Sequence, residues 1–382
     1  MEKFMYSTFL GLVATVLAAP APAAATRPVG GDDPIVYQGR AKLPAEELPE
    51  SLPQGARTAI STWAPWAAEF EYRMDLSADG RVLLLSIDTK KGAKGAKKNM
   101  VLIEDILDAT DGIMPLPDSR EAVAASDDED DDGTYEWGAR PRETQTAVLL
   151  EMDNEDHHGA AVAHLVELNP YLAAWGRAAA GMSGFVLESP LVAAWQPYIG
   201  IKEDYEGSPK AEMINRLAQM LTLRRFGQQP YWLAMGLAWH TEMEENKGIY
   251  CFPYRSGFVS SAEHENWNKL LENSLRRRKE ALTMRELAAL KRGHWDTDGA
   301  HLAWGTVAFL VRFHPDALPE ILDELYTLWD EQGRTENEDG NWERIPGFEP
   351  DLDAQLEVFQ KHVPDFLDQL LRFFAKGKLY KP

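Results

Sequence analysis

The second half of the sequence reads as helices almost without interruption, and this pattern limits the fold more than any other feature. Ser208-Pro209 is a strong helix start, because serine caps a first turn and proline is favoured at the first helical position. This helix is expected to end at Gly227, and Pro230 opens the next one. Further helices are predicted at 262–279, 283–291, 299–313, 316–331, 352–362 and 365–376.

Residues 61–207 instead mix strand and helix patterns. Two alternating segments, 69–76 and 81–87, flank the turn Ser77-Ala78-Asp79-Gly80 and predict a β-hairpin. The expected fold class is therefore α+β: a smaller N-terminal α/β part with a mixed sheet, followed by a mainly helical part at 208–382. The other predicted elements are strands at 145–152, 184–188 and 192–196 and helices at 99–110 and 158–180.

The first 25 residues have the layout of a secretory signal peptide. An apolar stretch at 9–19 leads into small residues that end at Ala25, a suitable cleavage site. The stretch is too short to span a bilayer stably, and no later segment is long enough to do so. We expect an exported protein, periplasmic or extracellular, with no stable membrane span. Residues 26–60, rich in proline, glycine and acids, are interpreted as a leader or linker.

Charge and cysteine content exclude several classes of protein. The formal net charge is -22, which argues against a nucleic-acid partner, and we interpret the basic clusters at 90–98 and 276–279 as solvated surface. The single cysteine, Cys251, allows no intramolecular disulfide. An acidic loop is predicted at 126–133; weak calcium association is the alternative, although Ala139 stands where a calcium loop needs its glutamate.

One segment carries a family resemblance. Its frame consists of Phe226-Gly227, Pro230, Trp232-Leu233 and Gly236-Leu237-Ala238. This frame resembles the core of the gluzincin-type (peptidase MA-like) zinc metallopeptidases. In that family one helix carries His-Glu-x-x-His, and Pro-x-Trp-Leu-x-Glu-Gly-Leu-Ala opens the next helix. The two histidines and the second glutamate bind zinc, and the first glutamate activates the zinc-bound water.

The resemblance implies that the zinc site has been lost. Asn215 stands at the first histidine, Arg216 at the catalytic glutamate, Gln219 at the second histidine and Met235 at the third ligand. Amides are poor zinc ligands, and a thioether is soft and neutral. Arg216 stays protonated and would repel a dication about 5 Å away by roughly 6–7 kcal/mol at an effective dielectric near 20. No metal and no cofactor are therefore expected.

The resulting functional expectation is a non-catalytic, peptidase-like protein, a pseudopeptidase, that binds a peptide or protein in a residual cleft. Arg216, Gln219 and Trp232 are the candidate binding residues, and Arg216 is a candidate for recognising a carboxylate such as a peptide C-terminus. Two alternatives stay open. One is an active zinc metallopeptidase with relocated ligands drawn from His240, Glu244 or His264. Glu242 and Glu245 lie close to His240 and Glu244, and we interpret this group as a solvated acidic face. The other is a purely structural envelope protein.

Two further histidine-containing segments were weighed as metal sites. His264-Glu265-Asn266-Trp267-Asn268 approaches His-Glu-x-x-His, but asparagine replaces the last ligand, so we interpret it as a polar helix start. His157, His158 and His164 lie near several acidic residues at a spacing that matches no standard site. We interpret these three histidines as part of a helix start and its surface.

Overall fold

The computed structural model describes residues 48–49, 51–115, 144–182, 184–188, 190–195, 208–251, 264, 266–276, 286–287, 297–336, 342–345 and 348–375. The predicted signal peptide, the leader up to residue 47 and the acidic run at 127–132 lie outside these residues. Most of the helix predicted at 283–291 lies outside them as well.

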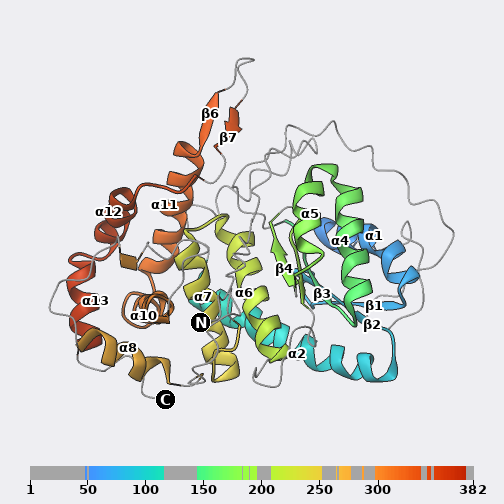
Figure 1. Ribbon diagram of the computed structural model, residues 1–382, viewed down its shortest axis with the longest axis horizontal. Helices are drawn as coiled ribbons and strands as arrows, with labels where there is room; N and C mark the ends of the chain where they lie inside the picture. The colour runs from blue at the N-terminus through green and yellow to red at the C-terminus, as the bar shows by residue number, and fades with distance from the viewer. Residues whose placement is uncertain are drawn as a thin grey trace, which may run out of the picture.

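A five-stranded mixed sheet forms the core of the N-terminal part, which confirms the expected α+β class (Figure 1). The sheet order is β1-β2-β3-β5-β4, with β2, β3 and β5 parallel and both outer strands antiparallel to their neighbours. The predicted hairpin is present as β1 and β2, and β4 is an edge strand. The strands are β1 (Tyr72–Leu76), β2 (Val82–Ile87), β3 (Ala147–Glu151), β4 (Gly184–Leu187) and β5 (Val192–Trp195).

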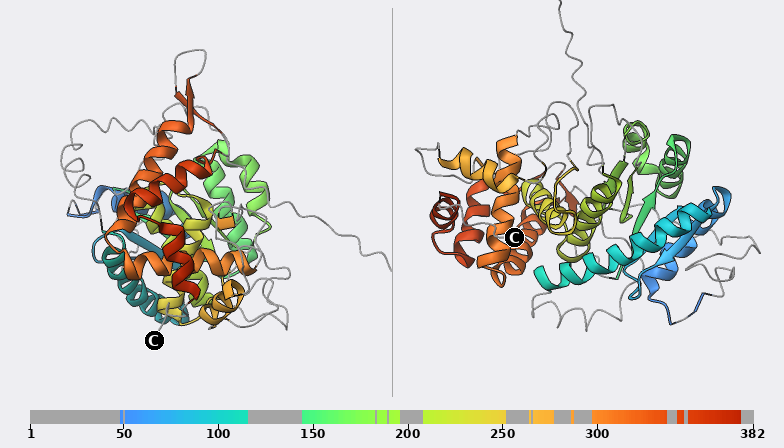
Figure 2. Two further views of the ribbon diagram at one scale, coloured as in Figure 1. Left: turned by 90° about the vertical axis from the view of Figure 1, so that its left-hand side faces the viewer. Right: turned by 90° about the horizontal axis from the view of Figure 1, so that it is seen from below.

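Helices cover both faces of this sheet, because its central strands are apolar on both sides. On one face, Leu83 and Leu85 of β2 pack in a core with α1 (Gln54–Glu69), α4 (Glu155–Leu168) and α5 (Ala173–Ala179). On the other face, Leu84 packs in a core with α2 (Lys90–Ile113) and α6 (Pro209–Phe226). Seen from below, α2 lies across the outside of the molecule (Figure 2).

Three elements differ from the sequence prediction. The helix predicted at 158–180 is interrupted by a short 3-10 helix, Pro170–Leu172, because proline has no N–H to continue the α-helical pattern. Helix α1 begins at Gln54, inside the range interpreted as leader or linker. Helix α2 begins at Lys90, nine residues before the predicted start, where Thr89 accepts a hydrogen bond from the Gly92 N–H.

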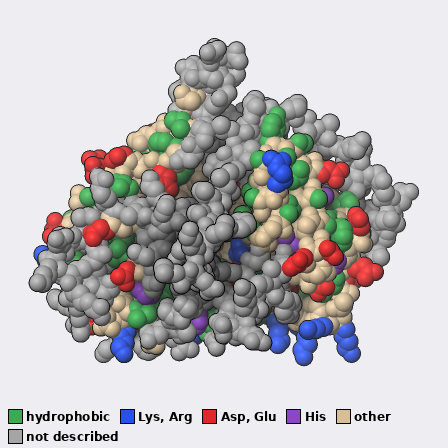
Figure 3. All heavy atoms as spheres, viewed as in Figure 1, with side chains coloured by type: hydrophobic (Ala, Val, Ile, Leu, Met, Phe, Trp, Pro, Cys, Tyr) green, Lys and Arg blue, Asp and Glu red, His purple; other side chains and the backbone are tan. Residues whose placement is uncertain are grey.

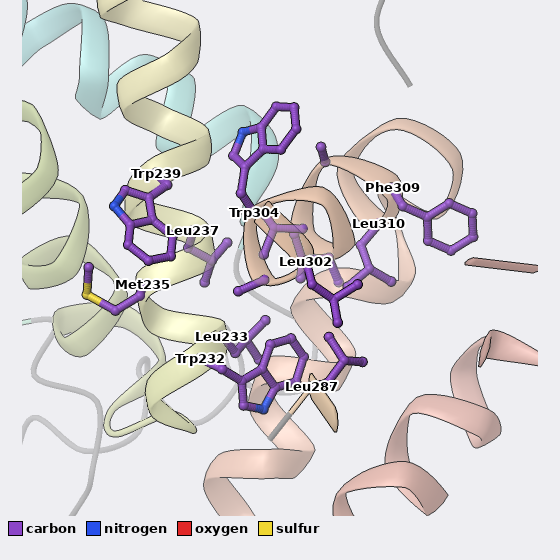
Figure 4. Packing of buried hydrophobic residues seen from close by; sticks show 14 of the residues in the cluster. Trp232, Leu233, Met235, Leu237, Trp239, Leu287, Leu302, Trp304, Phe309 and Leu310 are labelled. Atoms are coloured by element: carbon purple, nitrogen blue, oxygen red, sulfur yellow. The ribbon is translucent and has the colours of Figure 1, made fainter. Parts of the chain in front are cut away.

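The C-terminal part is helical apart from one small hairpin, β6 (Arg334–Glu336) and β7 (Trp342–Arg344), which was not predicted. Trp232, Leu233 and Leu237 of α7 pack in one core with Leu302 and Trp304 of α10 (Figure 4). None of the described helices is long and apolar enough to cross a membrane. The helices are α7 (Tyr231–Asn246), α8 (Trp267–Arg276), α10 (Thr297–Phe313), α11 (Ala317–Gln332), α12 (Leu352–His362) and α13 (Phe366–Ala375).

A glycine allows α7 and α10 to approach closely. A Cβ atom added at Gly236 would lie 2.7 Å from the Ala303 carbonyl oxygen of α10. No side chain fits in that space without moving one of the two helices. Gly236 therefore fixes how α7 sits against the rest of the helical part, and with it the face that α7 turns toward α6.

Candidate functional site

Helices α6 and α7 begin and end where the sequence predicts. The Ser208 side chain accepts a hydrogen bond from the Ala211 N–H, and Pro209 occupies the first turn. Gly227 ends α6 with a positive φ of 64°, a conformation that glycine adopts without a steric penalty. Pro230 precedes the first residue of α7. Helices α6 and α7 are therefore consecutive and separated by a short turn. Helix α6 carries Asn215, Arg216 and Gln219, and α7 carries Met235.

A buried chain of hydrogen bonds joins the two helices. Asn215 is fully buried, and its Nδ2 donates to Glu242 Oε2 at 3.1 Å. The Asn215 Oδ1 accepts from Gln219 Nε2 at 2.7 Å. The other carboxyl oxygen of Glu242 accepts from the backbone N–H groups of Tyr250 and Cys251, the second at 3.1 Å. We refer to Gln219, Asn215 and Glu242 as the amide–carboxyl chain.

Glu242 belongs to this site, although the family resemblance gives it no role. Its expected place on a solvated acidic face is wrong, because the side chain is 0% exposed. Its carboxyl is fully buried, and burial raises its pKa well above the ordinary value, against the lowering effect of the hydrogen bonds from Tyr250, Cys251 and Asn215. Glu212 raises the pKa further. A carboxyl of this kind keeps its proton to higher pH than an exposed one. A weak signal existed: Glu242 is seven residues from Met235 and so lies on the same side of α7.

Arg216 does not enter the amide–carboxyl chain. Its guanidinium pairs with Glu212 one turn earlier on α6, at 2.9 Å, and the Arg216 side chain is 13% exposed. A Cβ atom added at Gly184 would lie 2.8 Å from Arg216 Nη2, so the guanidinium rests against the backbone of strand β4. The Arg216 Nε atom is buried, and no described residue offers it an acceptor. Arg216 is thus a largely buried cation at the sheet edge, with one unused donor.

Met235 and Trp232 of α7 are both buried in the hydrophobic core of the helical part. Met235 is 3% exposed, and in Figure 4 it points away from Trp304 and the other α10 side chains. Trp232 is 2% exposed, lies 5.7 Å from the Phe359 ring and approaches Gln355 Oε1 at 3.4 Å. Trp232 and Met235 therefore both belong to the core of the helical part.

The arrangement leaves little that a zinc ion could use. Both polar atoms of the Asn215 amide form hydrogen bonds. The guanidinium of Arg216 forms an ion pair with Glu212. The described residues contain no group of three or more His, Cys, Asp and Glu side chains placed to hold a metal. Together these observations define a site whose described polar groups are engaged in hydrogen bonds with one another.

The two histidines proposed as relocated ligands are both buried. His240 is buried, and burial lowers its pKa, although Glu244 opposes this effect. His264 lies with its Nδ1 2.7 Å from the Ile249 carbonyl oxygen and stacks on Tyr250 at 4.1 Å. Both histidines are thus placed as side chains packed against the protein interior.

The three N-terminal histidines are not a surface cluster, so that interpretation is wrong for His158. His158 is fully buried, with Nε2 2.9 Å from the Ala179 carbonyl oxygen, and burial lowers its pKa. His157 and His164 are directed elsewhere, to Tyr72 Oη and to the Thr62 carbonyl oxygen, both at 3.2 Å. His157 and His164 are seven residues apart and lie on one face of α4, whereas His158 lies about 100° further round the helix and enters the core.

No family model matches the sequence, and no curated protein matches it. Fold and site together define an α+β protein whose central helix pair is joined by a buried amide–carboxyl chain.

Proposed function

We propose that this chain is an exported, non-catalytic, peptidase-like protein that binds a peptide or protein segment beside Arg216. The observation that carries the proposal is the amide–carboxyl chain. Gln219 and Asn215, the residues that stand at the two histidine positions of the resembled family, bond to each other and to Glu242. The bond between Asn215 and Glu242 links α6 to α7, and the Gln219 amide extends it along α6.

The chemistry of this site argues against hydrolysis. Zinc-dependent peptide hydrolysis needs a metal with an open coordination position and a nearby general base. The residue at the position of that base is Arg216, which has no basic form in proteins. Glu242, the nearby carboxyl, is fully buried, and its two oxygens accept hydrogen bonds from the Asn215 side chain and from the Tyr250 and Cys251 N–H groups, so it is placed as a structural acceptor.

The binding part of the proposal rests on strand β4 and Arg216. Strand β4 is at the edge of the described sheet, and an extended peptide can add to such an edge through backbone hydrogen bonds. The Arg216 guanidinium lies against Gly184 at the start of β4. A guanidinium has five N–H donors, and the hydrogen bond of Arg216 to Glu212 uses a donor on Nη2 alone. The remaining donors suit a carboxylate of a peptide ligand.

A peptide-binding assay tests the proposal. We expect peptides with a free carboxyl terminus or acidic side chains to bind more tightly than their amidated, neutral counterparts. Arg216→Ala should weaken binding of the acidic peptides by roughly tenfold or more, the usual loss of a charge-assisted hydrogen bond. Arg312→Ala, which removes an arginine from α10, is the matched control and should leave binding unchanged. Equal binding by the Arg216→Ala variant would refute the role given to Arg216.

A further inference from the structure

The first three turns of α2 carry a face made of lysines, which we call the lysine face: Lys90, Lys91, Lys94, Lys97 and Lys98. All five side chains are exposed. At about 100° per residue, they fall within an arc of roughly 120° on one side of the helix. The side that packs into the molecule carries Ala96, Ile103 and Ile106, opposite to this arc. Lys and Arg side chains gather at the lower edge of the view in Figure 3, where α2 runs in Figure 1.

The positive charge of this face is not compensated locally. Glu104 is the first acidic residue of α2, so the helix has none over its first fourteen residues. None of the five lysines forms an ion pair or hydrogen bond with another described residue. Elsewhere in the described chain, Arg81 and Arg225 both pair with Asp111. The lysine face is thus an unpaired basic surface on a chain whose net charge is -22.

The placement of the lysines opposes helix stability. The N-terminal end of a helix carries a partial positive charge, so cations in the first turn are unfavourable there, and α2 has no acid in that turn. A sequence selected only for folding would place acids at these positions. Local departures of this kind are expected where a surface serves a function. The helix end and the lysines add to one another and create a concentrated positive potential.

One exposed apolar side chain extends the same face. Val101 is 59% exposed, the highest exposure among the large hydrophobic side chains described as exposed. It lies one turn beyond Lys97 and seven residues after Lys94, so it falls on the same side of the helix. A row of lysines followed by an exposed valine suits a surface whose outer layer is anionic and whose interior is apolar.

We propose that the lysine face docks the protein onto an anionic phospholipid surface. Lysines are flexible point charges that suit many phosphate or carboxylate headgroups at once, whereas nucleic-acid sites usually add arginine forks or stacking aromatic rings, which this face lacks. Each lysine near such a surface contributes roughly a fivefold gain in binding. The negative charge elsewhere on the chain opposes docking little, because charges beyond about 8 Å are screened at physiological ionic strength. Docking of this kind is peripheral and reversible.

Co-sedimentation of the full chain with lipid vesicles tests the proposal. We expect binding to vesicles of phosphatidylcholine with phosphatidylserine, none to phosphatidylcholine alone, and a decline as salt rises. The variant K91Q/K94Q/K97Q/K98Q should lose at least about tenfold in binding. The control K210Q/K247Q/K269Q/K361Q removes four exposed lysines from other elements and changes the net charge equally, so it should bind like the parent protein.

Several outcomes would overturn the proposal: no binding to the anionic vesicles, equal binding to both kinds of vesicle, or an equal loss in the two quadruple variants. Tighter binding to duplex DNA than to anionic vesicles would also overturn it. If the first quadruple variant fails to fold, the single variants K94Q and K97Q replace it. Each single variant should weaken vesicle binding by roughly fivefold without changing the thermal unfolding temperature appreciably.

Discussion

Replacing Glu242 with glutamine is expected to make folding stability less dependent on pH. Burial raises the pKa of the Glu242 carboxyl in the folded protein, whereas in the unfolded chain it ionises near its ordinary value of about 4.3. Below that pH the carboxyl is protonated in both states and does not lower the free energy of unfolding. Above it, the folded protein loses stability as pH rises through the folded pKa, by up to about 1.4 kcal/mol per pH unit. Glutamine has nearly the same shape and no charge, so the variant escapes this loss.

Urea unfolding of both proteins at a series of pH values, starting near the ordinary carboxyl pKa of about 4.3 and rising from there, measures the effect. The free energy of unfolding of the Glu242→Gln variant minus that of the parent should increase with pH. A comparison variant, Glu324→Gln, removes a carboxyl whose pKa is lowered by hydrogen bonds from Lys361 and His362. In the parent protein this carboxyl loses its stabilising contribution only as pH falls below about 4.3, so the corresponding difference should stay nearly flat at higher pH and rise only in acid. A difference for Glu242→Gln that stays flat or declines with rising pH would refute the buried, proton-retaining carboxyl.

Three further substitutions give predictions of stability. Asn215→Ala leaves the Glu242 and Gln219 side chains without their shared partner and should lower the free energy of unfolding by about 2–4 kcal/mol, measured by urea unfolding; a loss under about 0.5 kcal/mol would show that the amide–carboxyl chain adds nothing. Gly236→Ala forces a Cβ atom to within 2.7 Å of a carbonyl oxygen and should cost about 1–3 kcal/mol, whereas Gly159→Ala on α4 meets no atom within 4 Å and should gain up to about 1 kcal/mol; equal effects at the two glycines would contradict the close approach of α7 and α10. Lys91→Glu should stabilise α2 by about 0.3–1 kcal/mol while weakening vesicle binding; thermal unfolding alongside co-sedimentation checks both, and a loss of stability would contradict the opposition between the lysine and the helix end.

The sequence predicts the fold best where local chemistry decides it. The start of α6 at Ser208-Pro209, its end at Gly227 and the β1–β2 hairpin follow from capping, glycine conformation and turn residues. Helix α1 was missed because Pro53 and Pro65 sit before and inside it, although its buried face includes Trp63. Packing against the sheet, which no local pattern reports, stabilises it.

The site was predicted only in part, for a similar reason. The resemblance indicated Asn215, Arg216 and Gln219, and the structure joins Asn215 and Gln219 in one chain of hydrogen bonds. It could not indicate Glu242, because the burial of that carboxyl depends on the backbone turning back at Tyr250 and Cys251. Contacts between residues that are distant along the chain or set by a loop have no periodic signature in a sequence.

The metal content of the purified full-length protein, measured together with peptidase activity with and without a chelator, tests the central claim most directly. The amide–carboxyl chain and the Arg216 cation predict less than stoichiometric zinc after dialysis against metal-free buffer, and no peptidase activity that a chelator removes. One tightly bound zinc per chain with chelator-sensitive peptide hydrolysis would contradict the account and would favour the relocated ligand set of His240, Glu244 and His264.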